Sequence, residues 1–196
     1  MKTVILGTAH GVNVAGKQSP DGRLHEYKYS REMCRMVRDR LTALGINCVI
    51  DIEDDTEPSL MQRVALVNRL VARHGDCIYV SIHNNAAGSD GKWHDACGFA
   101  VFVSPNASSG SKQLASIIHT YAMAMGMKGN RCHPATGYHV MNLAVCRATH
   151  CPAVLTENLF QDNRDDVDYL LSPQGKQAIT QLHVKSIVEY LKNHTS

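Results

Sequence analysis

The sequence predicts a single α/β domain with three layers, in which helices cover both faces of a twisted, mostly parallel sheet. Short apolar segments of strand composition alternate along the chain with longer segments whose apolar residues recur every three or four positions. Because a helix between two strands makes a right-handed crossover, this alternation places the strands parallel and the helices on the faces. The 196 residues, 44% of them hydrophobic, suffice for one core, so we expect one domain over residues 1–196.

The first half of the chain contains three strand candidates and two helix candidates. The first strand is "KTVILGT". Apolar residues between Tyr29 and Leu44 recur at helical spacing, and Gly45 stands where that helix should end. The second strand is "INCVIDI", the second helix is "SLMQRVALVNRLVARHG" with Gly75 at its end, and the third strand is "CIYVSI".

The second half continues the alternation. A fourth strand, "CGFAVFVS", is followed by the helix candidate "KQLASIIHTYAMAMG". Residues 126–139 are rich in glycine and polar groups and are typical of a loop. The buried strand "PAVLTENLF" comes next. A closing helix begins with Ser172 as its N-cap and Pro173 at the first helical position, and extends through Leu191.

Charge, hydropathy and cysteine content exclude several classes of protein. Lys and Arg number 20 against 18 Asp and Glu, without long runs of either sign, so we expect no nucleic-acid partner. The N-terminal apolar run is too short for a signal peptide, and no segment approaches the roughly 20 apolar residues of a membrane span. The seven cysteines include no C-x-x-C pair, which argues against a structural zinc knuckle or a thioredoxin-like site. Their odd number and the position of several in apolar runs indicate reduced thiols. We expect a monomer that stays in the cytoplasm until something releases it.

Four side chains of metal-binding or acid–base type lie at the ends of apolar segments. His10 follows the first strand, His83 ends the third, Glu157 ends the late strand and Glu26 opens the first helix. If the strands are parallel, all four lie at one rim of the sheet, where ligands bind in open α/β folds. Two histidines, one carboxylate and a water make a catalytic zinc site, and a second carboxylate would carry the proton.

Each of these residues also has a purely structural interpretation. His10 would line a turn, His83 would bond the neighbouring asparagines, and Glu26 would be a helix-start carboxylate favoured by the helix dipole. Glu157 is harder to explain in this way, because burying an acid without a partner is costly. The residues alone therefore leave both the metal site and the structural interpretation open.

The ordered segments "GTAHG", "HEYKYS", "SLMQRVALVN", "YVSIHNNA", "GFAVFV" and "PAVLTENLFQDNRDD" resemble the zinc-dependent N-acetylmuramoyl-L-alanine amidases of the family 3 type. This family occurs in bacterial wall hydrolases and phage endolysins. The resemblance covers nearly the whole chain, and "VSIHNNA" followed by "PAVLTENLF" is its most specific part. It implies that His10, Glu26 and His83 bind Zn²⁺ and that Glu157 is the catalytic acid–base residue.

The resemblance also implies a substrate and a setting. The family hydrolyses the amide that joins the lactyl group of N-acetylmuramic acid to the L-alanine of the stem peptide, so peptidoglycan is the expected partner. Residues 1–196 would form the amidase catalytic domain, and we expect no separate wall-binding domain. A phage or prophage lysin that waits in the cytoplasm fits the expected lack of a signal peptide.

The sequence departs from the family pattern in two places. The family usually opens with an Asp-Pro-Gly-His-Gly-like motif, whereas this chain has "LGTAHG" and lacks the acid. Metal-bound imidazoles usually donate their other N–H to a carboxylate or a carbonyl, so a backbone carbonyl would be the substitute at His10. His25, next to Glu26, would be the ligand if the register differed by one residue.

Three other functions compete with this one. A zinc peptidase that cuts within the stem peptide would use the same four residues. A cysteine hydrolase would use Cys151 beside His150, or Cys146, although adjacent residues on an extended segment point to opposite faces. The third is a non-catalytic wall-binding module that keeps the fold.

Overall fold

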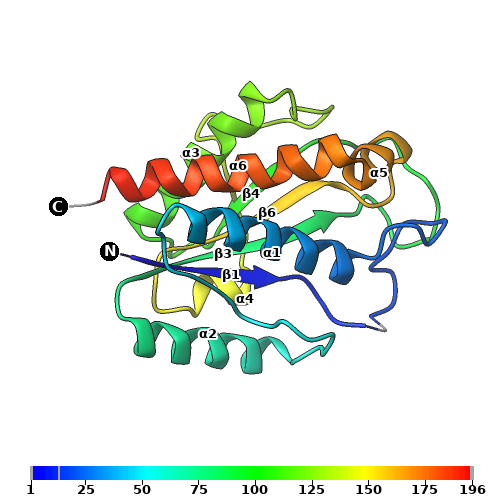
Figure 1. Ribbon diagram of the computed structural model, residues 1–196. Coiled ribbons are helices and arrows are strands. Elements are labelled where there is room, and N and C mark those ends of the chain that lie inside the picture. Colours follow the sequence, from blue (N-terminus) through cyan, green and yellow to red (C-terminus); the bar gives the residue numbers. More distant parts are fainter. Residues whose placement is uncertain (1, 13, 195–196) are drawn as a thin grey trace.

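Within residues 2–12 and 14–194, which the computed structural model describes, six strands form one sheet in the order β2-β1-β3-β6-β4-β5 (Figure 1). Met1, Asn13 and residues 195–196 of the expected domain lie outside the described residues. The strands are β1 (Thr3–Thr8), β2 (Cys48–Ile50), β3 (Cys77–Asn85), β4 (Ala100–Val103), β5 (His139–Val140) and β6 (Ala153–Phe160).

The sheet is mostly parallel, as predicted, with one exception. β1 pairs in parallel with β2 and β3, and β3 pairs in parallel with β6. The exception is the antiparallel pairing of β4 with β6; β5 pairs in parallel with β4, so these two strands run opposite to the other four described strands. No helix lies between β3 and β4, so the chain lacks the crossover that would return it in the same direction.

Helices cover both faces of the sheet, which confirms the predicted α/β class. The four expected helices are α1 (Glu26–Ala43), α2 (Leu60–His74), α3 (Ser109–Ala124) and α6 (Pro173–Lys192). The apolar sides of α1, α3 and α6 share one core cluster on one face, while α2 packs in a second cluster on the other face (Figure 1). Among the residues that the structure describes, no helix combines the length and the apolar composition that crossing a membrane requires.

The expected helix ends have clear physical causes. The Ser172 side chain accepts a hydrogen bond from the backbone N–H of Gly175, and Pro173 occupies the first helical position of α6, as predicted. Gly45 follows α1 with a φ of 74°, a left-handed conformation that glycine adopts without a Cβ penalty. Gly45 therefore marks the end of α1, and Ser172 and Pro173 mark the start of α6.

Three short elements were not expected from the sequence. β5 lies at the end of the predicted loop 126–139, α4 (Ala144–Arg147) is a single turn, and α5 (Arg164–Leu171) follows β6. β5 and α4 contain too few residues to show a hydrophobic period. The signal for α5 was present, because Asn163 caps the backbone N–H of Asp166 and two acids occupy the first turn.

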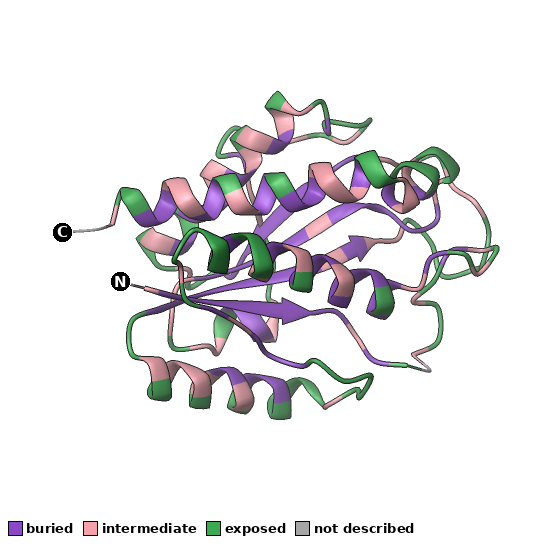
Figure 2. Ribbon diagram, viewed as in Figure 1, coloured by how far each residue is buried: buried purple, intermediate pink, exposed green. Residues whose placement is uncertain are grey.

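The sheet brings the carboxyl ends of three central strands to one rim. β1, β3 and β6 are buried over nearly their whole length, and β3 lies between the other two (Figure 2). Thr8 at the end of β1 is level with Ile82, and the next residue of β3, His83, is level with Glu157. His83 and Glu157 were expected to end their strands, but β3 continues to Asn85 and β6 to Phe160, because backbone pairing extends beyond the apolar run. Both residues therefore lie inside the sheet, and they emerge next to one another near the end of β1.

Candidate active site

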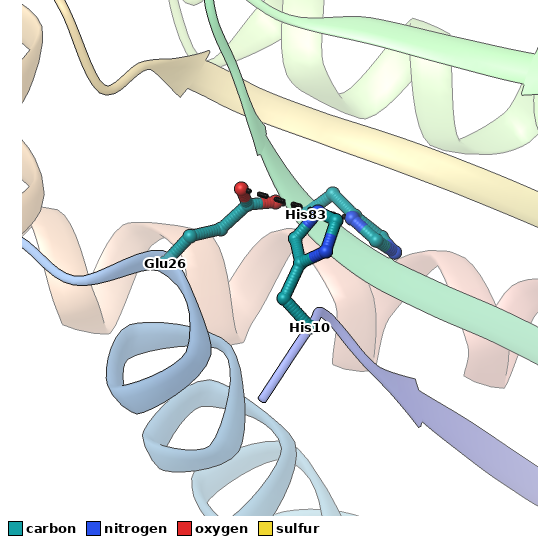
Figure 3. A group of neighbouring side chains, drawn as sticks. All are labelled: His10, Glu26 and His83. Atoms are coloured by element: carbon teal, nitrogen blue, oxygen red, sulfur yellow. Dashed lines mark hydrogen bonds and ion pairs between the residues drawn. The ribbon is translucent and has the colours of Figure 1, made fainter. Parts of the chain in front are cut away.

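Side chains of His10, Glu26 and His83 converge at this rim (Figure 3). One nitrogen or oxygen from each residue lies within 4.8 Å of the corresponding atoms of the other two. The Glu26 carboxylate faces both rings: Oε1 is 3.1 Å from Nδ1 of His83, and Oε2 is 3.5 Å from Nε2 of His10. Three segments far apart in the sequence thus form one cluster of potential metal ligands.

His10 is held in an uncommon backbone conformation. Its φ is 38°, in the left-handed region that residues other than glycine rarely adopt. The Arg31 guanidinium of α1 donates hydrogen bonds to the carbonyls of Ala9 and His10, and the Ser30 hydroxyl accepts one from the Ala9 N–H. Such strain persists only where the surroundings impose it, and it is frequent at functional sites.

Burial keeps the His10 imidazole neutral. It lowers the pKa of His10 to about 4, against the opposing effect of the Glu26 charge. At pH 7 the ring therefore has a free nitrogen lone pair, which is the form that binds metals.

Glu26 is the first residue of α1 and is 1% exposed. Burial acts to raise its pKa, but the hydrogen bond from His83 and the electrostatic interaction with the two imidazoles bring the pKa below its usual value. Oε1 also accepts a hydrogen bond from the backbone N–H of Asn84, whereas Oε2 is buried without a hydrogen-bond donor. A buried carboxylate oxygen without a donor is costly, and a cation beside it would remove that cost.

The second nitrogen of His83 is also engaged. Nε2 lies 3.1 Å from the hydroxyl of Ser81, a buried residue on the same strand. Nδ1 faces Glu26, so a metal ion at the cluster would meet Nδ1. A hydrogen bond at the other ring nitrogen is the usual way in which a ligating imidazole is oriented.

Glu157 lies beside this cluster. It is the β6 partner of His83 in the parallel ladder, and its Oε2 is buried without a hydrogen-bond partner. Burial raises the pKa of Glu157 to about 7, although the His83 charge opposes the shift. A carboxyl group with this pKa both accepts and releases protons near neutral pH.

All four residues line one cavity of about 560 Å³. Its lining also includes Lys17, from the segment before α1, and residues 142–145 and Arg147, around the short helix α4. A cavity of this volume is in the usual range of ligand-binding sites.

A family model described as N-acetylmuramoyl-L-alanine amidase matches residues 4–189. The chain belongs to this amidase family. Among solved structures, it is similar to the catalytic domain of CwlV, an N-acetylmuramoyl-L-alanine amidase from Bacillus (Paenibacillus) polymyxa var. colistinus. The TM-score is 0.80 at 27% identity, over 98% of this chain and 99% of that one. An N-acetylmuramoyl-L-alanine amidase from Clostridium difficile 630 shares the fold, with a TM-score of 0.83 at 23% identity over 98% of each chain.

Two curated relatives agree with this assignment. The amidase is 33% identical over 193 residues to the endolysin of Bacillus phage SPP1, covering 97% of this chain and 66% of that protein. It is 25% identical over 189 residues to N-acetylmuramoyl-L-alanine amidase CwlM of Bacillus licheniformis, covering 95% and 68%. The chain thus spans about two thirds of the length of these relatives. It is an amide hydrolase by family.

The amidase structure does not support a cysteine nucleophile. Cys146 and Cys151 line a separate cavity of about 320 Å³, together with His150. Burial raises the pKa of both thiols to about 12, so neither forms a thiolate near neutral pH. His25 does not join the histidine–glutamate cluster either; its ring lies 6.0 Å from that of Tyr27.

Sequence reasoning missed a carboxylate beside His10. The Oε1 atom of Glu57 lies 3.8 Å from Nδ1 of His10, on the side of the ring opposite to the nitrogen that faces Glu26. Glu57 is therefore a side-chain candidate for the role of the missing acid of the "LGTAHG" opening, in addition to the expected backbone carbonyl. Glu57 lies in the segment before α2, and no local pattern links it to His10.

A buried ion pair that sequence reasoning also missed supports the rim. The guanidinium of Arg63 donates to Oδ2 of Asp51 over 3.0 Å and to the carbonyl of Thr8. Oδ1 of Asp51 accepts from the backbone N–H of Thr8, and the Tyr79 hydroxyl donates to Oδ2. This network ties the end of β1, two residues before His10, to β2 and α2.

Proposed function

We propose that this amidase hydrolyses the amide between the lactyl group of N-acetylmuramic acid and L-alanine in peptidoglycan, using a zinc ion and Glu157. The observation that carries the proposal is the convergence of His10, Glu26 and His83 in a cavity that Glu157 also lines. The family assignment supplies the reaction class, and these four side chains supply the chemistry.

His10, Glu26 and His83 would hold the metal. Two imidazole nitrogens and one carboxylate oxygen are a donor set found in catalytic zinc sites. Oε2 of Glu26 is buried and accepts no hydrogen bond from the described residues, so a cation beside it would be favourable. Zinc at this place supplies Lewis acidity toward a carbonyl oxygen and lowers the pKa of water toward about 7.

Glu157 would move the proton. As a carboxylate it takes a proton from the attacking water, and as a carboxylic acid it gives that proton to the nitrogen of the departing alanine. Its pKa of about 7 suits both halves of this cycle. The half-buried position beside His83 keeps the carboxyl close to the reacting atoms.

The described unit would be sufficient for catalysis. The family match extends over residues 4–189, and the likeness to the CwlV catalytic domain covers nearly all of both chains. Because one relative is named an endolysin, we further propose a lysin role in which the enzyme acts on the wall once it reaches it.

Digestion of purified peptidoglycan tests the proposal. An amidase releases peptides with a free L-alanine amino group, which mass analysis identifies, and chelation should abolish this release until zinc is restored. Release of fragments cut within the stem peptide would instead assign a peptidase. Binding to the wall without any release would assign a non-catalytic module.

A further inference from the structure

Lys17 is a cationic residue that lines the active-site cavity. Its backbone carbonyl accepts a hydrogen bond from the N–H of Glu26 over 2.9 Å. The carbonyl of the preceding residue, Gly16, accepts one from the side chain of Gln161, a buried residue just after β6. Both contacts tie this segment to elements that build the site, so the position of the lysine backbone is set relative to Glu26.

The Lys17 ammonium has no hydrogen-bond or ion-pair partner within the described part of the chain. The two other cations that line the cavity are engaged. Arg63 pairs with Asp51, and Arg147 donates to the side-chain oxygen of Asn142. Lys17 is therefore the cavity cation that remains available to a ligand.

Lys17 lines the same cavity as His10, Glu26 and Glu157. Its charge acts to lower the pKa of each of these three groups, although burial raises the pKa of Glu157 overall. In the proposed mechanism Glu26 is committed to a cation and Glu157 to proton transfer. The third acid of the cavity lining, Glu57, lies beside His10, with 3.8 Å between its Oε1 and Nδ1 of the ring. An anionic group of the substrate is therefore a suitable partner for Lys17.

We propose that Lys17 forms a subsite for the stem-peptide carboxylate that lies nearest to the scissile amide. This inference rests on the proposed function, because it takes the muramoyl-alanine bond as the bond that is cleaved. The muramoyl side of that bond carries no formal charge, whereas the peptide side continues from alanine to a D-glutamate residue with a free α-carboxylate. An ammonium group forms charge-assisted hydrogen bonds with such a carboxylate.

Another part of the cavity lining suits the uncharged side of the substrate. Leu143, Ala144 and Val145 belong to it, and the Arg147 guanidinium of the same segment donates to the Asn142 side chain. Apolar side chains match the neutral faces of an amino sugar. We therefore expect the peptide carboxylate at Lys17 and the sugar beside residues 143–145.

Two synthetic substrates test the subsite with the zinc-loaded full chain. They are muramoyl peptides that differ only in the second residue, which is D-glutamate in one and D-isoglutamine in the other, so that a carboxylate becomes a carboxamide. We expect wild-type enzyme to favour the carboxylate substrate by about tenfold or more in kcat/KM, since hydrogen bonds to charged groups are worth roughly a factor of ten or more.

Variants at Lys17 assign this preference to the side chain. Lys17→Met should bring the ratio of the two kcat/KM values close to one, and Lys17→Arg should keep most of it. Lys112→Met, at an exposed position of α3, makes the same change in net charge away from the cavity and should keep the wild-type ratio. Both substrates are measured on one preparation, so a change in folded fraction cancels from the ratio.

The outcomes distinguish failure of the Lys17 subsite from failure of the proposed function. Equal cleavage of both substrates by wild type, or a Lys17→Met variant with the wild-type ratio, overturns the subsite and leaves the proposed function standing. Cleavage of neither substrate by the zinc-loaded chain contradicts the proposed function, and the subsite with it.

Discussion

His83 and Glu157 are direct partners in the parallel ladder between β3 and β6. Partners in a parallel pair project to the same face of a sheet, so the backbone itself places the Glu157 carboxyl beside the imidazole. A potential metal ligand and a potential proton carrier are thereby joined by rigid elements of the sheet. Sites built on strands are positioned more accurately than sites built on loops.

Replacing the Glu157 carboxyl by an amide should separate catalysis from metal binding. Glu157→Gln keeps the size of the side chain but cannot carry a proton, so we expect a loss of about 10²–10⁴ in kcat with unchanged zinc content. Kinetics on peptidoglycan and metal analysis of the same sample check this. A variant within tenfold of wild type would remove Glu157 from the mechanism.

The raised pKa of Glu157 predicts a pH effect on the stability of the metal-free protein. The pKa is about 7 in the folded state against 4.5 as the ordinary value, so the folded state binds this proton more tightly. The associated stability is complete below pH 4.5 and is lost as the pH rises through 7. Glu157→Gln should therefore stabilise the metal-free protein at pH 8, by at most about 3 kcal/mol, and have little effect at pH 4.

Chemical unfolding at the two pH values, after chelation, measures this difference. An equal effect of Glu157→Gln at pH 4 and pH 8 would show that the carboxyl does not titrate as described. Asp95→Asn is a suitable control and should have a similar effect at both pH values, because Asp95 is exposed and its carboxylate makes no hydrogen bond or ion pair within the described residues.

Glu57 should support metal binding through His10. If its carboxylate orients the ring by attracting the Nδ1–H, Glu57→Gln will weaken zinc binding by about tenfold or more, the usual cost of losing such a partner. Competition with a chromophoric chelator gives the affinity. Glu53→Gln, which alters an exposed ion pair with Arg38, should leave the affinity unchanged; equal affinities for both variants would show that Glu57 has no such role.

The ion pair between Asp51 and Arg63 should matter for folding. Both side chains are buried, so Asp51→Ala leaves an unpaired guanidinium in the interior and is expected to cost about 3–5 kcal/mol. Asp76→Ala removes the exposed partner of Lys2 and should cost less than about 1 kcal/mol. Urea unfolding of the two variants compares them; equal losses would contradict the assigned importance of the buried pair.

Much of the fold and the central residues of the site followed from strand and helix patterns. His10, His83 and Glu157 each follow or end an apolar run, and parallel strands bring such ends together regardless of their separation in sequence. Glu26 followed from its position at the start of a predicted helix. These residues were predictable because regular elements fix where they lie.

The loop residues were not predictable in this way. Glu57 and Lys17 reach the site from irregular segments, and no hydrophobic period indicates the direction of such segments. The reversed direction of β4 was implicit in the lack of a helix before it, but its place next to β6 depends on the packing of the whole sheet. The partners of His10 and the charges of the cavity therefore required the structure.

The central claim is that three side chains bind one metal ion. The anomalous difference map of a crystal of the zinc-loaded protein, recorded at the zinc absorption edge, tests this most directly. We expect one strong peak at about 2.0–2.2 Å from a nitrogen of His10, a nitrogen of His83 and an oxygen of Glu26. A fully loaded protein whose peak lies away from these three residues would contradict it.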